Sequence, residues 1–273
     1  MKDKPVILIT GANGQLGKEL RDIAPSYPQF HFIFLSREDL PVHHFELVRN
    51  YFEITKPDYC INGAAYTAVD KAESEKQLAF QVNGEAVGVL AAVCKKYQTK
   101  FIHISTDYVF DGTATVPYSE TSATNPLSVY GASKLEGEKQ ALRYNPESII
   151  IRTSWVYSPH GKNFVKTMRQ LMKEKDEINV VNDQIGSPTY AGDLANVILD
   201  IIANCQPAYR TGRLSTANFH PGIYHYSNDG IISWYNFAVA IKELTGSNCM
   251  VHPISTSQYP TPATRPHYSV FNK

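Results

Sequence analysis

Two side chains that could together form a proton donor, Tyr130 and Lys134, lie four residues apart in the chain. If this segment is helical, both side chains lie on one face of the helix. A nearby ammonium favours the phenolate, so we expect Lys134 to lower the pKa of Tyr130 from its usual value of about 10. Thr106, 24 residues earlier, could hold a carbonyl oxygen while the phenol protonates it. Surface helices also carry such a pair by chance, so its meaning depends on its surroundings.

A glycine-rich turn follows the first apolar run of the chain, Val6–Thr10, and opens a helix-like segment, Gln15–Ile23. Gly11 permits a tight turn, Gly14 lets the backbone approach a pyrophosphate, and Gly17 lets helix and strand pack closely. The first N–H groups of the helix then face the phosphates. The spacing is GxxGxxG rather than GxGxxG, and a turn without a ligand is the alternative. The strand–turn–helix order favours a nucleotide site formed by Gly11, Asn13, Gly14, Gln15, Leu16 and Gly17.

The end of the second predicted strand indicates which nucleotide binds. An acidic side chain at this place binds a ribose 2′-hydroxyl, whereas an arginine accepts a 2′-phosphate. The chain reads Ser36-Arg37-Glu38-Asp39. Ser36 and Arg37 come first, so we expect NADPH with Arg37 as a cofactor-binding residue, while Glu38 and Asp39 keep NADH open.

Small residues follow the third predicted strand, in the segment 62–67. They would let the cofactor pass close to the backbone, so we predict contacts from Ala64, Ala65 and Tyr66. A simple turn at the strand end is the alternative.

Strand and helix patterns alternate through the first half of the chain, which predicts an α/β fold of the Rossmann type: a doubly wound, mostly parallel sheet. The predicted strands are Val6–Thr10, Phe30–Leu35, Tyr59–Asn62, Phe101–Ser105 and Ile149–Arg152. The predicted helices are Gln15–Ile23, Leu78–Tyr97, Val129–Tyr144, Phe164–Lys175 and Asp193–Ala203. We expect residues 184–189 to form a loop and the proline-rich residues 252–266 to lack regular structure. Residues 1–155 should mainly bind the cofactor, and residues 156–273 should mainly form a smaller, loop-rich substrate lobe, interleaved with the sheet domain.

The overall composition argues against several classes of partner. The 273 residues contain 26 basic and 26 acidic side chains, so no net charge favours nucleic acid or an anionic membrane. The four cysteines are far apart, which disfavours a disulfide framework and fits a reducing compartment. We find no signal peptide and no apolar stretch of the roughly 18 residues needed to span a bilayer. We therefore expect a cytoplasmic protein.

Ser105 and Thr106 end the fourth predicted strand, at the edge where open α/β sheets bind ligands. A hydroxyl, a tyrosine and a lysine around a nicotinamide form a carbonyl-reducing site, in which hydride reaches carbon and the phenol protonates oxygen. Lys134 would bind the nicotinamide ribose and tune Tyr130. The order of these residues along the chain favours this interpretation over separate structural roles for each residue.

The chain resembles the extended short-chain dehydrogenase/reductases and, within them, the dTDP-4-dehydrorhamnose reductases. The resemblance rests on the glycine turn and on segments 62–67, 105–112, 130–134, 152–157 and 184–195. It implies that NADPH reduces the 4-keto group of dTDP-6-deoxy-L-lyxo-4-hexulose to give dTDP-L-rhamnose. Thr106, Tyr130 and Lys134 match the catalytic residues, and Thr106, Asp107, Tyr108, Tyr130 and Trp155 match positions that bind the sugar substrate.

The resemblance also concerns residues outside this set. Asn83 matches a helix position that supports the surroundings of the tyrosine, although a surface amide is an equal alternative. Arg265 resembles an arginine near the nucleotide pyrophosphate, with a solvated tail residue as the alternative. For Trp155, core packing is the alternative. Some relatives bind Mg²⁺ at a dimer interface. We found no carboxylates in this sequence that match the ligands of that ion, so we predict no metal. A homodimer stays a possible assembly.

Two other functions fit parts of the pattern. A nucleotide-sugar epimerase or 4,6-dehydratase would retain NAD, and a dehydratase should have an acidic pair after its threonine, whereas here Tyr108 follows Asp107. A non-catalytic regulatory subunit, like the β subunit of methionine adenosyltransferase, would have a similar fold. The intact set of Thr106, Tyr130 and Lys134 favours an enzyme.

Overall fold

The computed structural model describes residues 4–205 and 218–273. Its centre is a parallel sheet of six strands in the order β10-β5-β4-β3-β1-β2. The predicted α/β fold of the Rossmann type is therefore confirmed. The strand order reverses between β1 and β3, and ligands of such sheets bind where the order reverses. The strands are β1 (Val6–Thr10), β2 (His31–Leu35), β3 (Tyr59–Asn62), β4 (Lys100–Thr106), β5 (Ile149–Thr153) and β10 (Gly222–Tyr226).

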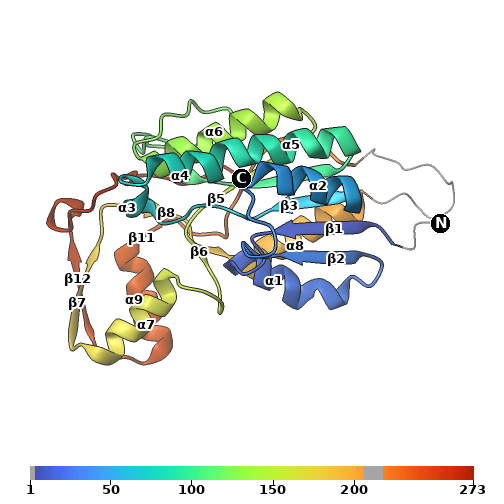
Figure 1. The fold of residues 1–273 in the computed structure, drawn as a ribbon. Helices are drawn as coiled ribbons and strands as arrows, with labels where there is room; N and C mark the ends of the chain where they lie inside the picture. Colours follow the sequence, from blue (N-terminus) through green and yellow to red (C-terminus); the bar gives the residue numbers. More distant parts are fainter. Residues whose placement is uncertain (1–3, 206–217) are drawn as a thin grey trace.

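Helices cover both faces of this sheet, as Figure 1 shows. Alternate residues of β1 explain the two layers: Ile7 and Ile9 belong to one buried cluster, and Leu8 belongs to the other. The first cluster includes residues of α1 (Gln15–Ile23) and α8 (Ala191–Asn204). The second includes residues of α2 (Phe45–Thr55), α5 (Ala86–Tyr97) and α6 (Val129–Tyr144).

The predicted helix Leu78–Tyr97 is three consecutive helical pieces. They are α4 (Lys76–Phe80), the π-helical turn η2 (Gln81–Glu85) and α5. The whole run, Lys76–Tyr97, is long and apolar enough to span a bilayer, but 56% of its most apolar window is buried within the protein. Because α5 packs on α6 and α2, the run is a core helix of the fold, and it is weak evidence for a membrane segment.

A smaller lobe lies beside the carboxyl edge of the sheet (Figure 1). It packs α7 (Phe164–Glu174) and α9 (Trp234–Thr245) on a two-stranded sheet of β7 (Glu177–Val181) and β12 (Met250–Ile254). Its core contains Met168, Met172, Ile178, Val180, Ala238, Ile241 and Cys249. The short elements are α3 (Val69–Ala72), β6 (Val156–Tyr157), β8 (Ile185–Gly186), β9 (Thr189–Tyr190), β11 (Ile232–Ser233), η1 (Ala24–Ser26), η3 (Asp107–Val109) and η4 (Thr256–Gln258).

Two loop predictions were wrong in part. Residues 184–189 contain β8 and the start of β9, which pair with β11 and β6. The proline-rich tail contains most of β12 and all of η4. Pro253 is compatible with β12 because, among the described residues, this strand pairs only with β7, so its missing N–H breaks no second ladder.

Elements from beyond residue 155 also return to the main sheet. β10 pairs with β5, and α8 packs on α1. A boundary at residue 155 therefore separates the sheet domain from the lobe only approximately. The division into a cofactor-binding and a substrate-binding part stays a prediction.

Candidate functional site

The turn between β1 and α1 brings backbone close to backbone. Gly11 has φ +69, and a Cβ there would lie 2.6 Å from the backbone N of Ala64. A Cβ on Gly17 would lie 2.6 Å from the Cα of Ala12, so this helix residue lies directly against the turn. Gly14 is the N-cap of α1 and supplies no side-chain cap, and the first turn has no acidic residue. The N–H groups that begin α1 can therefore bind an anion.

A cavity of about 730 Å³ opens at this turn and continues along the carboxyl ends of the strands. Every predicted site residue lines it: the turn residues, Arg37, residues 64–66, the Thr106–Tyr130–Lys134 set, and Asp107, Tyr108 and Trp155. They come from the ends of β1, β2, β3, β4 and β5 and from the start of α6. The fold thus brings together residues that are up to 144 positions apart in the sequence.

Tyr130 lies in the first turn of α6, where the sequence fixes the helix start. The Ser128 hydroxyl caps the helix by accepting the Gly131 N–H at 3.2 Å, and the Glu73 carboxylate accepts the Val129 N–H at 2.8 Å. The Tyr130 phenol forms a hydrogen bond with Thr106. The hydroxyl and the phenol are therefore adjacent, as a shared carbonyl ligand would require.

The expected effect of Lys134 on this phenol was wrong. Burial raises the pKa of Tyr130 to about 12, the Thr106 hydrogen bond lowers it in part, and the Asp107 charge raises it further. The Lys134 ammonium instead donates to the Ile104 carbonyl oxygen at 2.6 Å. In a buried site the loss of hydration outweighs a more distant charge, so Tyr130 is firmly protonated at neutral pH.

Lys134 is almost fully buried, with 2% of its surface exposed. Burial lowers its pKa to about 8, and the charge of Glu138 opposes this shift. Glu138 itself forms a buried ion pair with Arg152 at 2.7 Å. Lys134 therefore keeps most of its charge at neutral pH, and the ion pair beside it joins α6 to β5.

Asp107 and Tyr108 follow Thr106 in the short helix η3. The Thr106 hydroxyl donates to Asp107 Oδ1 at 3.0 Å, while the buried Oδ2 has no protein partner. Burial raises the pKa of Asp107 to about 6. The Tyr108 ring meets the Tyr130 ring edge to face at 5.5 Å. Asp107 is thus a buried carboxylate within electrostatic reach of the Tyr130 phenol.

Trp155 is both a cavity residue and a packed ring, and its role in sugar binding stays a prediction. It lines the cavity, and its ring stacks on Trp234 at 3.6 Å between centroids with 10° between planes. Its backbone has φ +48, which is uncommon for a bulky residue. A Cβ on Gly186 would lie 2.7 Å from the Trp155 ring. The ring is therefore fixed in place between Gly186 and Trp234.

Trp234 is a cavity residue that our sequence reasoning missed, as are His43, Gly161 and Lys162. Trp234 begins α9 directly after the capping residue Ser233, and its ring also packs on Phe164 at 4.6 Å. Its only signal in the sequence is the aromatic cluster Trp234-Tyr235-Asn236-Phe237. A cluster of this kind more often indicates a core helix.

Two residues named from the resemblance lie beside the cavity. Asn83 is fully buried: it accepts the Tyr66 N–H at 2.8 Å and donates to the Tyr66 carbonyl and the Ser133 hydroxyl, each at 3.0 Å. The surface alternative for Asn83 is therefore wrong. Arg265 binds both carboxylate oxygens of Asp70 at 2.8 and 3.0 Å, so it is no free tail residue. Its role at a pyrophosphate stays a prediction.

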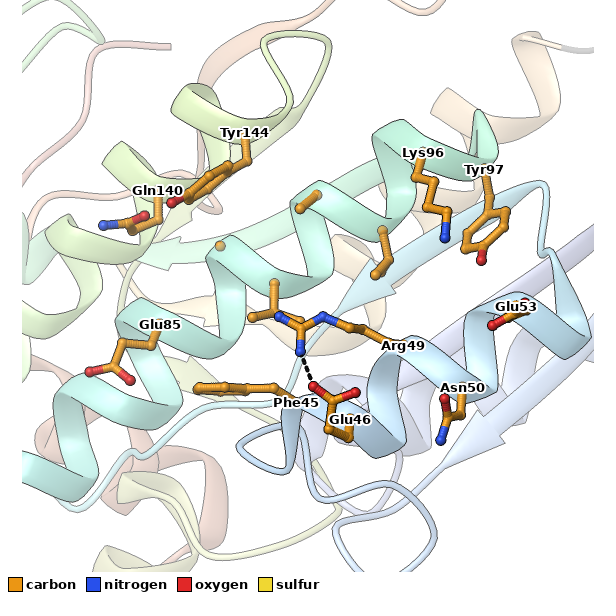
Figure 2. Close-up of a pocket in the computed structure, with 14 residues that line it drawn as sticks. Phe45, Glu46, Arg49, Asn50, Glu53, Glu85, Lys96, Tyr97, Gln140 and Tyr144 are labelled. Carbon is orange, nitrogen blue, oxygen red and sulfur yellow. Dashed lines mark hydrogen bonds and ion pairs between the residues drawn. The ribbon is translucent and has the colours of Figure 1, made fainter.

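A second hollow lies between α2, α5 and α6, and Figure 2 shows its side chains. Charges of both signs line it, and Arg49 pairs with Glu46 across one turn of α2. Its lining residues include none of the predicted site residues. This hollow is separate from the cavity at the strand ends.

Three potential metal ligands gather at the edge of α1. Ligand atoms of Glu19, Asp22 and His160 lie within 4.8 Å of one another. The His160 ring already contacts Asp22 at 2.7 Å, and such acidic groups are common without an ion. The prediction that no metal binds stays a prediction.

Comparison with known proteins identifies the family. The family model described as "RmlD substrate binding domain" matches residues 5–273. The dTDP-4-dehydrorhamnose reductase of Aggregatibacter actinomycetemcomitans is 41% identical over 95% of this chain and 88% of its own length.

Solved structures agree with this match. A dTDP-4-dehydrorhamnose reductase from Clostridium acetobutylicum superposes with a TM-score of 0.90 at 42% identity, covering 98% of this chain and 90% of that protein. The Bacillus anthracis reductase, solved in complex with NADP, gives a TM-score of 0.90 at 38% identity with the same coverage. With the family model matching nearly the whole chain, the chain belongs to the dTDP-4-dehydrorhamnose reductase family.

Proposed function

We propose that the protein uses NADPH to reduce the 4-keto group of dTDP-6-deoxy-L-lyxo-4-hexulose to dTDP-L-rhamnose. One observation carries this proposal: Thr106, Tyr130 and Lys134 line the same cavity as the glycine turn. A carbonyl held by the hydroxyl and the phenol can therefore lie beside a nucleotide bound at α1. The related Bacillus anthracis reductase binds NADP, which supports the choice of cofactor.

The residues at the turn fit a dinucleotide. Gly11, Asn13, Gly14, Gln15, Leu16 and Gly17 would hold the pyrophosphate on the open N-terminus of α1. Ala64, Ala65 and Tyr66 would line the middle of the cofactor, and Arg37 would meet the adenosine ribose. The backbone of residues 63 and 64 fills the space that a Cβ at position 11 would need. Only glycine therefore fits at this position of the turn.

The bound cofactor supplies a hydride to carbon 4 of the sugar. Tyr130 gives its proton to the carbonyl oxygen, and Thr106 holds that oxygen through its hydroxyl. Lys134 would bind the nicotinamide ribose through its ammonium, which the Ile104 carbonyl oxygen orients. Asp107 and Tyr108 would bind sugar hydroxyls, while Trp155 would cover the apolar face of the deoxyhexose.

The remaining assignments follow from this function. We propose that residues 1–155 mainly bind the cofactor and residues 156–273 mainly bind the sugar. We propose a cytoplasmic enzyme that acts on a small dTDP-sugar, without nucleic acid or a membrane, and a homodimer as its assembly. Light scattering of the purified protein tests the assembly, with a monomeric mass as the contradicting result.

The direct test is NADPH consumption with the dTDP-4-keto-6-deoxyhexose, with NADH in parallel. We expect stoichiometric oxidation of NADPH and formation of dTDP-L-rhamnose. Tightly retained NAD with no net oxidation would favour an epimerase. Capture of a partner enzyme by a protein that turns over no dTDP-ketosugar would favour a regulatory subunit.

A further inference from the structure

The loop between β6 and α7, residues 158–163, lies against the glycine turn of the sheet domain. Asn163 Nδ2 donates to Gln15 Oε1 at 2.8 Å, and Gln15 Nε2 donates to the Val156 carbonyl oxygen at 3.2 Å. Gly161 has φ +64, and a Cβ there would lie 3.2 Å from Gln15 Cγ. The Gln15 side chain therefore joins the glycine turn to the loop and to β6 at the same time.

The amide groups of both side chains are used in these contacts. Asn163 Nδ2 also donates to the Ser158 carbonyl oxygen at 2.8 Å, and Asn163 Oδ1 accepts the Lys166 N–H as the cap of α7. Gln15 is the first residue of α1, so its backbone N–H is one of the free donors of that helix. A phosphate bound at α1 would thus contact the Gln15 backbone, while the Gln15 side chain stays with the lobe.

The bond to Val156 bears on the position of Trp155, the residue before it. The Trp155 carbonyl oxygen accepts the Thr189 N–H of β9 at 3.3 Å, whereas the next carbonyl oxygen accepts the Gln15 amide. Trp155 and Gln15 line the same cavity. The backbone that carries the Trp155 ring is therefore tied to β9 on one side and to the glycine turn on the other.

A second contact between α1 and this loop is more exposed. His160 contacts Asp22 at 2.7 Å, and their side chains are 29% and 58% exposed, so water and salt screen this pair. Gln15 and Asn163 are half-buried. Their hydrogen bond is less readily replaced by water, so it is the better candidate for fixing the loop on the turn.

We propose that Gln15 and Asn163 are positioning residues for the sugar substrate, whose hydrogen bond holds the Trp155 side of the cavity at a fixed place beside the cofactor turn. This inference rests on the proposed function. Neither amide would touch the reacting atoms, because each acts through the loop and β6. Loss of the bond should therefore weaken sugar binding and spare both NADPH binding and the chemical step.

Asn163→Ser tests the inference, because serine can still cap α7 but has no amide to reach Gln15. Steady-state kinetics with the dTDP-ketosugar should show KM raised about fivefold, as for one lost hydrogen bond, with kcat changed less than about twofold. NADPH affinity, measured by fluorescence titration, should equal that of the wild type. An unchanged melting temperature would show that the cap and the fold are kept.

Gln15→Met is the second variant, since it keeps the backbone N–H and the helix while removing the amide. It should raise KM by a similar factor, and the double variant should lose no more than either single variant, because both remove one shared bond. Lys166→Met is the matched control. Lys166 Nζ donates to the Pro159 carbonyl oxygen at 3.0 Å, a bond of the same loop that stays within the lobe, so KM should not change.

Three results would overturn the inference while leaving the proposed function intact. One is an unchanged KM in Asn163→Ser, and another is a loss in kcat or in NADPH affinity in place of the rise in KM. The third is additive effects of the two substitutions, which would show that Gln15 and Asn163 act separately. A wild type that oxidises no NADPH with the dTDP-ketosugar would instead contradict the proposed function, and this inference would fail with it.

Discussion

The two sides of the cavity are held in place by different means. On the sheet side, Thr106 ends a central strand, and Tyr130 and Lys134 lie on a capped helix packed against it. On the lobe side, Trp155 is held by ring stacking on Trp234 and by contact with Gly186. The sheet side is therefore held by backbone hydrogen bonds between strands and the lobe side by contacts between rings. The sheet side is thus suited to the chemical step, and the lobe side to fitting the sugar.

Among the substitutions proposed here, we expect the largest loss of activity from Tyr130, on the sheet side. Tyr130→Phe keeps the ring and removes only the phenol that we propose as the proton donor, so kcat should fall roughly 10²–10⁴-fold. NADPH affinity, measured by fluorescence titration, should not change. Tyr118→Phe is a control, since this phenol hydrogen-bonds Asp111 outside the cavity. A kcat within threefold of the wild type would remove Tyr130 from the mechanism.

The sheet side should also be sensitive to its buried ion pair. Arg152 and Glu138 have side chains 3% and 2% exposed, and their contact links β5 to α6 just behind Lys134. Arg152→Met leaves Glu138 as an unpaired buried charge, so we expect a loss of about 3 kcal/mol in the free energy of unfolding. Urea denaturation followed by circular dichroism measures this loss.

An exposed ion pair is the control for the loss in the free energy of unfolding expected of Arg152→Met. Arg49→Met breaks the contact with Glu46 at the surface of α2, where both side chains are at least half exposed. Surface pairs contribute less than about 1 kcal/mol. Equal losses in the free energy of unfolding for Arg152→Met and Arg49→Met would contradict the prediction. They would show that the buried pair stabilises the sheet side no more than a surface pair does.

On the lobe side we expect a smaller effect, and on a different kinetic constant. Trp155→Ala should raise KM about 30-fold with a modest change in kcat if the ring has its proposed role, in which it covers the sugar and does not react. Trp234→Ala should raise KM about fivefold, because it releases the Trp155 ring and removes part of the cavity wall. Steady-state kinetics with the dTDP-ketosugar separates the two constants. A fall in kcat that equals the rise in KM would place the tryptophan pair in the chemical step.

The sequence could predict the sheet side because its signals are local. The glycine turn, the Ser128 cap and the apolar runs each act within a few residues, and β1, β3, α1 and α6 have the predicted bounds. The lobe depends on contacts between distant segments, such as Trp155 with Trp234 and β7 with β12. No local pattern encodes such pairings, so both Trp234 and β12 were missed.

The same limit explains the error at Tyr130. Four-residue spacing places Lys134 on the correct face, but it cannot show that the ammonium turns to the Ile104 carbonyl. Nor can spacing measure burial, which controls the pKa of the phenol here. The spacing could therefore predict that Lys134 and Tyr130 lie on one face of the helix, but it could not predict the pKa of Tyr130.

The smallest predicted effect concerns Asp107, which directly follows β4 at the carboxyl edge of the sheet. Its carboxylate must accept the Thr106 hydroxyl, so kcat/KM should fall as pH drops through about 6, where Asp107 becomes protonated. Asp107→Asn should remove this acidic limb while lowering the plateau severalfold. Asp111→Asn, which changes a half-buried carboxylate of the next loop outside the cavity, should keep the limb.

Stability gives an independent check on the same group. The pKa of Asp107 is raised in the folded protein, so between about 4 and 6 the folded state binds more protons than the unfolded state. Stability contributed by this group is therefore greatest in acid and is lost as pH rises through about 6. Asp107→Asn should then gain stability relative to the wild type on going from pH 4.5 to pH 7.5, as thermal melts would show. An unchanged difference would mean that Asp107 is hydrated, and that the lobe leaves this edge of the sheet open to water.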